Sequence, residues 1–273
     1  MKGMALGQYY PAQSVLHRTD PRMKVILTIL YIVCSFLCKN VLSFALLLLS
    51  ALCLVAVGRI PLKIVLRGLR PVLIVLAFTA ILNIFWTKGD HLLFGWRFIQ
   101  IYGEGLYAAV FMMIRITTLI IGTSMLLTYT TTPIALTDAL EDLLSPLKKL
   151  RVPVHEFAMM MTIALRFIPL LVEETDKIMT AQKARGVDFS SGSLMSRAKA
   201  LIPVLIPLFV SAFNRAGDLA TAMECRCYHG GNGRTRMHVL RLRPRDFVPL
   251  ALVLALGASL ILLNVAGIGY TMK

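Results

Sequence analysis

The feature that most constrains this chain is a set of long apolar segments that contain almost no charged residues. A helix needs about 20 apolar residues to cross a bilayer, or somewhat fewer when flanking basic side chains reach back to the interface. The segments show no alternation of apolar and polar residues, which argues against the strands of a membrane barrel. We therefore predict an all-α integral membrane protein with about five transmembrane helices. The segments are residues 23–38, 41–57, 71–86, 106–129 and 247–265.

Charge is unevenly distributed along the chain, and its distribution predicts how the spans are oriented. Because positively charged loops stay in the cytoplasm, the N-terminus and the loop after the second span are predicted to be cytoplasmic. The loop after the first span offers only Lys39. A formal net charge of +15 could also indicate nucleic-acid binding, but basic flanks are ordinary in membrane proteins, so we expect the lipid bilayer and no nucleic acid as a partner. The orienting residues are Lys2, Arg18, Arg22 and Lys24 before the first span, and Arg59, Lys63, Arg67 and Arg70 after the second.

The middle of the chain, residues 130–246, departs from this pattern and holds sixteen of the 29 Lys and Arg residues. It contains helical segments with wide apolar faces at residues 131–150, 154–186 and 193–228. If either long segment crossed the membrane alone, basic residues would lie outside, against the positive-inside bias. We therefore predict helices that lie along or under the cytoplasmic face of the membrane. Crossing of the two long segments as a pair keeps the same final topology and stays open as an alternative.

The expected organisation is L-shaped: one arm consists of the transmembrane helices, and the other, called the floor, consists of apolar helices that lie along the cytoplasmic face of the membrane. Residues 1–129 form the first four transmembrane helices, 130–246 the long amphipathic cytoplasmic-side helices, and 247–273 the last transmembrane helix. The floor presents apolar surface that the chain itself can hardly cover, and such surface usually marks a contact with protein or membrane. The chain is therefore predicted to be one subunit of a complex.

The segment TTPIALTDALEDLLSPLKKL, residues 131–150, carries start and stop signals for a helix. Thr132 can cap the N-terminus, and Pro133 fits the first helical position. Acidic residues come early and basic residues late, which suits the helix dipole. One apolar face is predicted from residues spaced by three and four: Leu140, Leu143, Leu144, Leu147 and Leu150.

Two apolar segments of the chain end on the same lone cation. TAQKARGV, residues 180–187, and TAMECRCY, residues 221–228, both begin with Thr-Ala and place an arginine sixth, Arg185 and Arg226. Glycines follow both closely, so each arginine is predicted to lie in a last helical turn. In one interpretation, each arginine only stabilises a helix C-terminus, by about 0.3–1 kcal/mol. In the other interpretation, the two arginines insert into two equivalent pockets of a partner protein and pair with carboxylates there. A partner with two equivalent pockets has pseudo-twofold symmetry.

Nearly the whole chain resembles the transmembrane T component of energy-coupling factor transporters. LHRTDPRMK, residues 16–24, resembles the N-terminal signature of that family, and physically it supplies an Asp20 cap, Pro21 at the first helical position, and basic anchors at the membrane surface. Residues 131–150 and 164–186 are also similar to the family. The most specific feature is a pair of Ala-Arg-Gly motifs. The first is matched fully by Ala184, Arg185 and Gly186, whereas Cys225, Arg226 and Cys227 keep the arginine and lose both small neighbours.

This resemblance implies a function and a set of partners. In the family, the two motifs end coupling helices that dock in grooves of two ATP-binding cassette ATPase subunits. Arg185 and Arg226 would each engage acidic groove residues. A membrane-embedded substrate-binding S component would topple and release a vitamin or another micronutrient into a prokaryotic cell, with this chain in the cell membrane. The chain itself would be non-catalytic, with no cofactor and no metal.

Three other functions fit the sequence less well. A conventional permease would need a polar translocation path, and we identify none. A membrane enzyme acting on lipid would need a nucleophile or an acid–base cluster, and none is convincing. A purely structural anchor predicts that the two arginines are dispensable. The chain also lacks the Gly-x-x-x-x-Gly-Lys-Ser/Thr phosphate loop, so ATP hydrolysis is expected in partner subunits.

Two further features of the sequence could carry a function. Cys225, Cys227 and His229 are metal-ligand types, but a closed zinc site takes four ligands, and no second cluster lies nearby in sequence. Arg115 lies inside the fourth apolar segment, and an intramembrane charge is a functional hypothesis by default. It could face the bundle interior, meet a partner subunit or extend outward to the interface.

Overall fold

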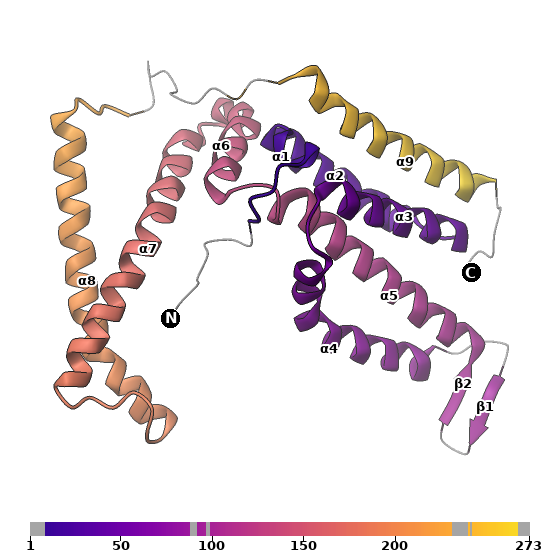
Figure 1. Ribbon diagram of the computed structural model, residues 1–273, viewed down its shortest axis with the longest axis horizontal. Coiled ribbons are helices and arrows are strands. Elements are labelled where there is room, and N and C mark those ends of the chain that lie inside the picture. The colour runs from indigo at the N-terminus through magenta and orange to yellow at the C-terminus, as the bar shows by residue number, and fades with distance from the viewer. Residues whose placement is uncertain (1–8, 88–91, 97–98, 231–239, 241, 267–273) are drawn as a thin grey trace. The chain divides into compact units, whose positions relative to one another are not determined.

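The computed structural model describes residues 9–87, 92–96, 99–230, 240 and 242–266, and nearly all of these are helical (Figure 1). The predicted all-α integral membrane fold is confirmed, apart from one short hairpin. The chain divides into two compact units. One comprises Met1–Ala139 with Leu240–Lys273, and the other comprises Leu140–Val239.

The first unit is a bundle of apolar helices. Its π-turn η1 continues α5, and a 3-10 turn, η3, leads into α9. The predicted third span begins earlier than expected, because the helix runs through Arg67, Arg70 and Pro71. The elements are α1 Val15–Arg18, α2 Pro21–Leu37, α3 Val41–Gly58, α4 Leu62–Trp86, β1 Leu92–Trp96, β2 Ile99–Tyr102, α5 Gly103–Thr123, η1 Ser124–Thr128, η3 Pro244–Asp246 and α9 Phe247–Val265.

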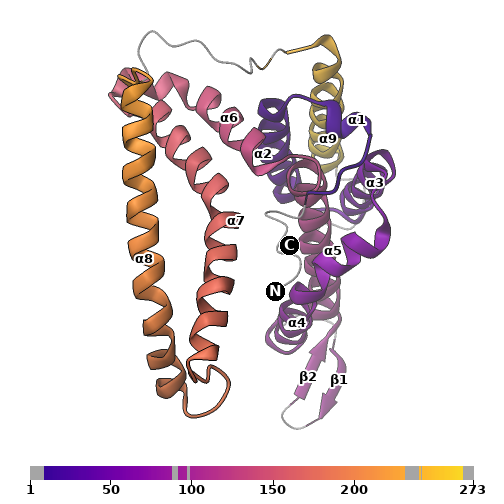
Figure 2. The same cartoon turned by 60° about the vertical axis from the view of Figure 1, so that its left-hand side comes forward.

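The second unit contains two long helices that run side by side in opposite directions, α7 Val154–Ala184 and α8 Leu194–Cys225 (Figures 1 and 2). Helix α6, Pro133–Leu143, crosses the boundary between the units, and the 3-10 helix η2, Ser145–Leu150, follows it. The single leucine face predicted over residues 131–150 is therefore wrong in its second half. Pro146 cannot donate a helical hydrogen bond, and the chain tightens into 3-10 geometry there.

Strands β1 and β2 form a two-stranded antiparallel hairpin between α4 and α5, which the sequence pattern did not predict. Leu92 pairs with Tyr102 and Trp96 with Ile99, and the register shifts between Leu92 and Phe94. The segment lies in the loop after the third predicted span. An isolated hairpin of this size is marginal in water, so its position between two packed helices stabilises it.

Six helices in the described part of the chain are long and apolar enough to cross a membrane. Four match predicted spans, and the other two are α7 and α8, which we predicted to lie along the membrane. Helix α2, predicted as the first span, has 17 residues and is slightly shorter than these six. This count rests on length and composition alone, so the placement of α7 and α8 stays a prediction. The six are Val41–Gly58, Leu62–Trp86, Gly103–Thr128, Val154–Ala184, Met195–Cys225 and Pro244–Val265.

The predicted start of α2 is confirmed, and it is joined to the start of α9. Asp20 caps α2 by accepting from the Arg22 amide at 2.9 Å, and Pro21 is the first helical residue. The Asp246 carboxylate accepts from the Asp20 amide at 3.1 Å and from the Arg243 amide at 2.8 Å. Because α2 and α9 both begin at this carboxylate, they run in the same direction.

Lys24 is not the surface anchor that the sequence predicts. Its side chain is 3% exposed, and its Nζ donates to the Thr130 carbonyl at 2.8 Å. The negative charges of the buried Asp20 and Asp246 carboxylates attract the positive charge of this amine. A buried charge needs such compensation, so Lys24 ties α2 to the turn after η1.

Arg115 faces the bundle interior, which is one of the three orientations considered for it. Its Nη2 donates to the Cys38 carbonyl at 2.8 Å, and its guanidinium carbon lies 5.1 Å from the centre of the Phe44 ring. Cys38 is the C-cap residue of α2. The cation therefore satisfies a helix C-terminus and stacks on an aromatic ring inside the bundle.

Candidate docking site at two helix ends

The end of α7 has the geometry that glycine normally provides. Arg185 is the C-cap residue, and Gly186 follows it in the left-handed region, with φ of 88°. The Gly186 amide donates to Lys183 at 3.0 Å, and the Val187 amide donates to Gln182 at 3.1 Å. These two bonds, from amides beyond the helix to carbonyls of its last turn, form a Schellman motif. The motif supplies donors to carbonyls that have no partner within the helix.

The end of α8 repeats this geometry without a glycine. Arg226 is the C-cap residue, and Cys227 takes the left-handed conformation, with φ of 56°. The Cys227 amide donates to Glu224 at 2.9 Å, and the Tyr228 amide donates to Met223 at 3.0 Å. The prediction that both arginines lie at the last turn of a helix is confirmed. The loss of both small neighbours at the second motif has not changed the backbone conformation.

Cys227→Gly is expected to stabilise the end of α8 by about 1 kcal/mol, because a left-handed backbone strains any residue with a Cβ. Amide exchange in the last turn of α8 should slow about fivefold. Cys225→Gly is a matched control of opposite sign, because Cys225 is the last residue of α8 and has helical geometry, in which glycine costs up to about 1 kcal/mol. Equal exchange rates in the two variants would contradict the prediction.

Both arginines are exposed, and so are the flanking residues Ala184, Gly186, Cys225 and Cys227. In the described residues, neither guanidinium has a hydrogen-bond or ion-pair partner. The two motifs therefore present uncompensated cations at the surface of this unit.

The carboxylate nearest to Arg185 in sequence is already occupied. Asp188 closes the turn after α7 by accepting from the hydroxyls of Ser191 and Ser190 at 2.5 and 2.7 Å and from their amides at 3.3 and 2.8 Å. These bonds, with the Ser191 hydroxyl first, hold the pKa of Asp188 well below its usual range. The turn is thus stabilised internally, and the Arg185 charge remains available to a partner.

An ion pair fixes how the two ends are spaced, and sequence reasoning missed it. The Arg215 Nη2 lies 2.8 Å from Glu174 Oε2, with both side chains about one-third exposed or less. Glu174 stands 11 residues before Arg185, and Arg215 stands 11 residues before Arg226, the same 41-residue offset that separates the two motifs. That offset was visible in the sequence, but applied to charged residues upstream it pairs Lys177 with Asp218 as well as Glu174 with Arg215, so the sequence alone does not select the pair that forms.

Equivalent positions of the two helices therefore meet near a local pseudo-twofold axis. A second contact, from Gln182 Nε2 to the Pro203 carbonyl at 3.3 Å, shows the same antiparallel course. At 1.5 Å of rise per residue, each arginine lies about 16 Å along its helix from the ion pair, in opposite directions. Along the helix pair, the two cations are thus about 33 Å apart. The two helix ends that carry them lie at opposite ends of the pair (Figure 2).

Both long helices also expose much apolar surface. Large aliphatic and aromatic side chains recur along α8 at helical spacing. The rings of Phe209 and Phe213 pack on each other, with their centres 4.7 Å apart. A surface of this kind on a subunit marks contact with protein or lipid. The side chains of α8 involved are Leu201, Ile202, Leu205, Ile206, Phe209, Val210 and Phe213, and on α7 they are Phe157, Met160, Met161 and Ile168.

Comparison with known proteins gives consistent results over nearly the full length. The model of the CbiQ family, described as cobalt transport protein, matches residues 12–239. A protein of Ruminiclostridium cellulolyticum named energy-coupling factor transporter transmembrane protein EcfT is 54% identical over 246 residues, 90% of this chain and 91% of that protein. Proteins with the same name are 51% identical in Clostridium kluyveri, covering 91% of this chain and 92% of that protein. In Bacillus subtilis the identity is 47%, covering 97% and 99%.

Proposed function

Because the chain belongs to the CbiQ family and is a transmembrane component of an energy-coupling factor transporter, we propose that it is the coupling subunit of an importer. It links ATP hydrolysis by two ATPase subunits to the toppling of a membrane-embedded S component that carries a vitamin or another micronutrient. It has no catalytic residues of its own. It resides in the cell membrane of a prokaryote, with its N-terminus in the cytoplasm.

The observation that carries this proposal is the symmetric repetition of one helix end. Arg185 and Arg226 cap helices with the same hydrogen-bond pattern, and the Glu174–Arg215 pair lies midway between them. Two equivalent cations about 33 Å apart suit a partner that offers two equivalent acidic grooves. Two similar ATPase subunits related by a pseudo-twofold axis provide that arrangement.

The mechanism follows from what each end contacts. A guanidinium pairs with carboxylates in a fixed two-pronged geometry, so it moves with its groove. When ATP closes the ATPase dimer, the two grooves approach each other and shift the ends of α7 and α8. The helices can transmit this shift only as far as their contacts differ between the two ATPase states. The apolar surface of α7 and α8 is the surface on which the S component changes its tilt.

The test is recovery of the ATPase subunits and ATP-driven substrate uptake with Arg185→Glu, Arg226→Glu and the double variant. Each single reversal places a carboxylate against an acidic groove and should lower recovery of the complex at least tenfold. The double variant should lose both ATPases and all uptake. Membrane insertion of every variant is measured in parallel.

Arg151→Glu is the matched control, because Arg151 is also an exposed C-cap arginine of the same unit, at the end of η2. It should retain assembly and uptake. Assembly and uptake that persist in the double variant would reduce the two arginines to ordinary helix ends. Equal loss in Arg151→Glu would point to net charge, not to two docking sites.

A further inference from the structure

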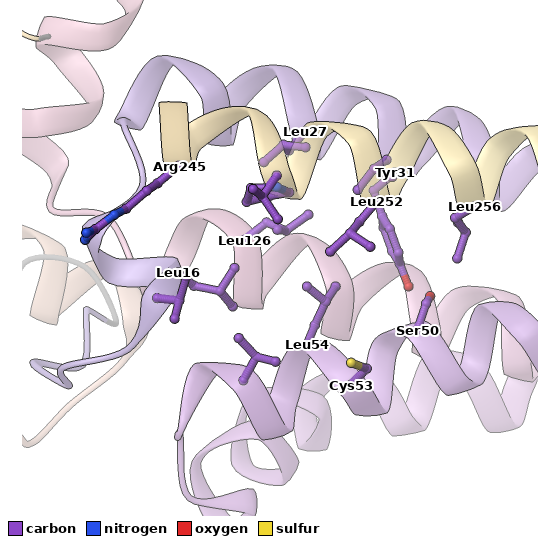
Figure 3. Close-up of a pocket in the computed structure, with 15 residues that line it drawn as sticks. Leu16, Leu27, Tyr31, Ser50, Cys53, Leu54, Leu126, Arg245, Leu252 and Leu256 are labelled. Carbon is purple, nitrogen blue, oxygen red and sulfur yellow. The ribbon is translucent and has the colours of Figure 1, made fainter. Parts of the chain in front are cut away.

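The first unit contains a cavity that the coupling mechanism does not use. It has a volume of about 460 Å³ and lies between α1, α2, α3, η1 and α9 (Figure 3). Its walls are almost wholly aliphatic. The walls are formed by apolar side chains, which include Leu16, Leu27, Leu54, Leu126, Leu252 and Leu256.

The few polar atoms in the wall are already satisfied. The Ser50 hydroxyl donates to the Leu47 carbonyl of its own helix at 2.6 Å, and the Tyr31 hydroxyl donates to the Thr118 carbonyl at 3.4 Å. A polar ligand binds through a few well-placed polar groups, and neither of these hydroxyls is free to donate to one. The cavity therefore suits hydrocarbon.

The one charged residue in the wall, Arg245, lies at one end of the cavity, and its guanidinium points away from the aliphatic walls (Figure 3). It is exposed and has no ion-pair partner in the part of the chain that the structure describes. The adjacent carboxylate, Asp246, is 4% exposed and already accepts hydrogen bonds from the Asp20 and Arg243 amides. Arg245 can therefore hold an anion at the mouth of an apolar groove.

The dimensions of the groove match one lipid chain in one leaflet. From Arg245 to Leu256 the wall spans twelve residues, and their eleven steps of helical rise cover about 16 Å, which is close to half of the roughly 30 Å hydrocarbon core. An apolar cavity of about 150 Å³ accommodates benzene, so a cavity about three times larger accommodates a chain of roughly 18 carbons.

We propose that this groove binds one anionic phospholipid, with an acyl chain along α9 and the phosphate on Arg245. An anionic headgroup is favoured because the wall contributes a cation and no carboxylate. With the N-terminus in the cytoplasm, Arg245 lies at the cytoplasmic leaflet, where anionic lipids are concentrated. The lipid fills the space beside α9 and holds it against α2 and α3. This site is independent of the ATPase-docking proposal, because all its residues belong to the first unit.

Native mass spectrometry of the full chain in detergent, titrated with phosphatidylglycerol, tests the proposal. One lipid should bind saturably to the wild type. Arg245→Gln should weaken this binding at least fivefold, and Leu252→Trp or Cys53→Trp, which fill the groove, should abolish it. Arg70→Gln is the control, because Arg70 is an exposed cation of α4, which contributes nothing to the groove.

Competing ligands separate the headgroup from the chain. Phosphatidylcholine should bind at least fivefold more weakly, and glycerol phosphate, which has no acyl chains, should not bind. Equal binding of phosphatidylcholine, or full retention of phosphatidylglycerol in both groove-filling variants, would overturn the proposal in favour of non-specific surface lipid. Equal weakening in Arg70→Gln would show attraction to net charge only.

Discussion

Replacing Asp246 by alanine is expected to lower the free energy of unfolding by about 3–5 kcal/mol, the range for breaking a buried charge cluster. The carboxylate is 4% exposed and accepts from the backbone of two separate segments, at Asp20 and Arg243. Its removal leaves both amides without an acceptor and takes one of two counter-charges from Lys24. For a chain of this size, the midpoint of thermal unfolding should fall by about 10 °C.

The buried thiols of Cys34 and Cys38 report this unfolding directly. A thiol-reactive fluorophore reaches them only when the bundle opens, provided that the three exposed cysteines are removed as Cys53→Ala, Cys225→Ala and Cys227→Gly. Asp246→Asn should fall between alanine and the wild type, because it keeps an acceptor oxygen and loses the charge.

Asp188→Ala is the matched control for burial. Asp188 accepts four hydrogen bonds, more than Asp246, but it is exposed, so water replaces what the turn loses. Its substitution should shift the midpoint far less. A midpoint for Asp246→Ala within 2 °C of the wild type would mean that the cluster does not join α2 to α9.

Local signals in the sequence predicted the ends of several elements. Asp20 followed by Pro21 marked the start of α2, and Thr132 followed by Pro133 marked the start of α6. These succeeded because caps depend on side chains within three residues of the helix end. The last turn at Arg185 was predictable for the same reason, from the glycine that follows it.

What the sequence did not predict depends on residues far apart in the chain. The partner of Arg115 is the carbonyl of Cys38, 77 positions away, and no local pattern indicates it. Lys24 looked like a surface anchor because nothing near it in sequence shows that Thr130 and Asp246 enclose it. Cys227 adopts the left-handed conformation that glycine usually takes. The hydrogen bonds that close the end of α8 require it, and their stabilisation outweighs the strain of a Cβ in this conformation.

Gly122→Ala is expected to destabilise the bundle by about 3 kcal/mol, even though alanine favours a helix over glycine by about 1 kcal/mol. An alanine Cβ at this position of α5 would overlap the ring of Tyr31 on α2. That ring is 1% exposed, and it can move away from α5 only by entering the cavity that it lines and losing the hydrogen bond from its hydroxyl to the Thr118 carbonyl. The absence of a side chain at Gly122 therefore allows α2 and α5 to approach closely.

Gly58→Ala is the matched control. Its added Cβ would overlap only the terminal methyl of Met125, a buried but flexible end of a long side chain that can turn away at little cost, and it would make ordinary contacts with Leu16 and Ile60. Measured by the same thiol reporter, Gly58→Ala should stay within about 1 kcal/mol of the wild type.

Tyr31→Leu should relieve the Gly122→Ala overlap, because the atoms that collide belong to the aromatic ring. On its own, Tyr31→Leu leaves a cavity and costs stability, so the two substitutions should be less harmful together than the sum of their separate costs. A coupling of about 1–3 kcal/mol is expected for residues in direct contact. Additive costs would mean that Gly122 affects stability through the backbone alone, and that the spacing of α2 and α5 is set elsewhere in the bundle.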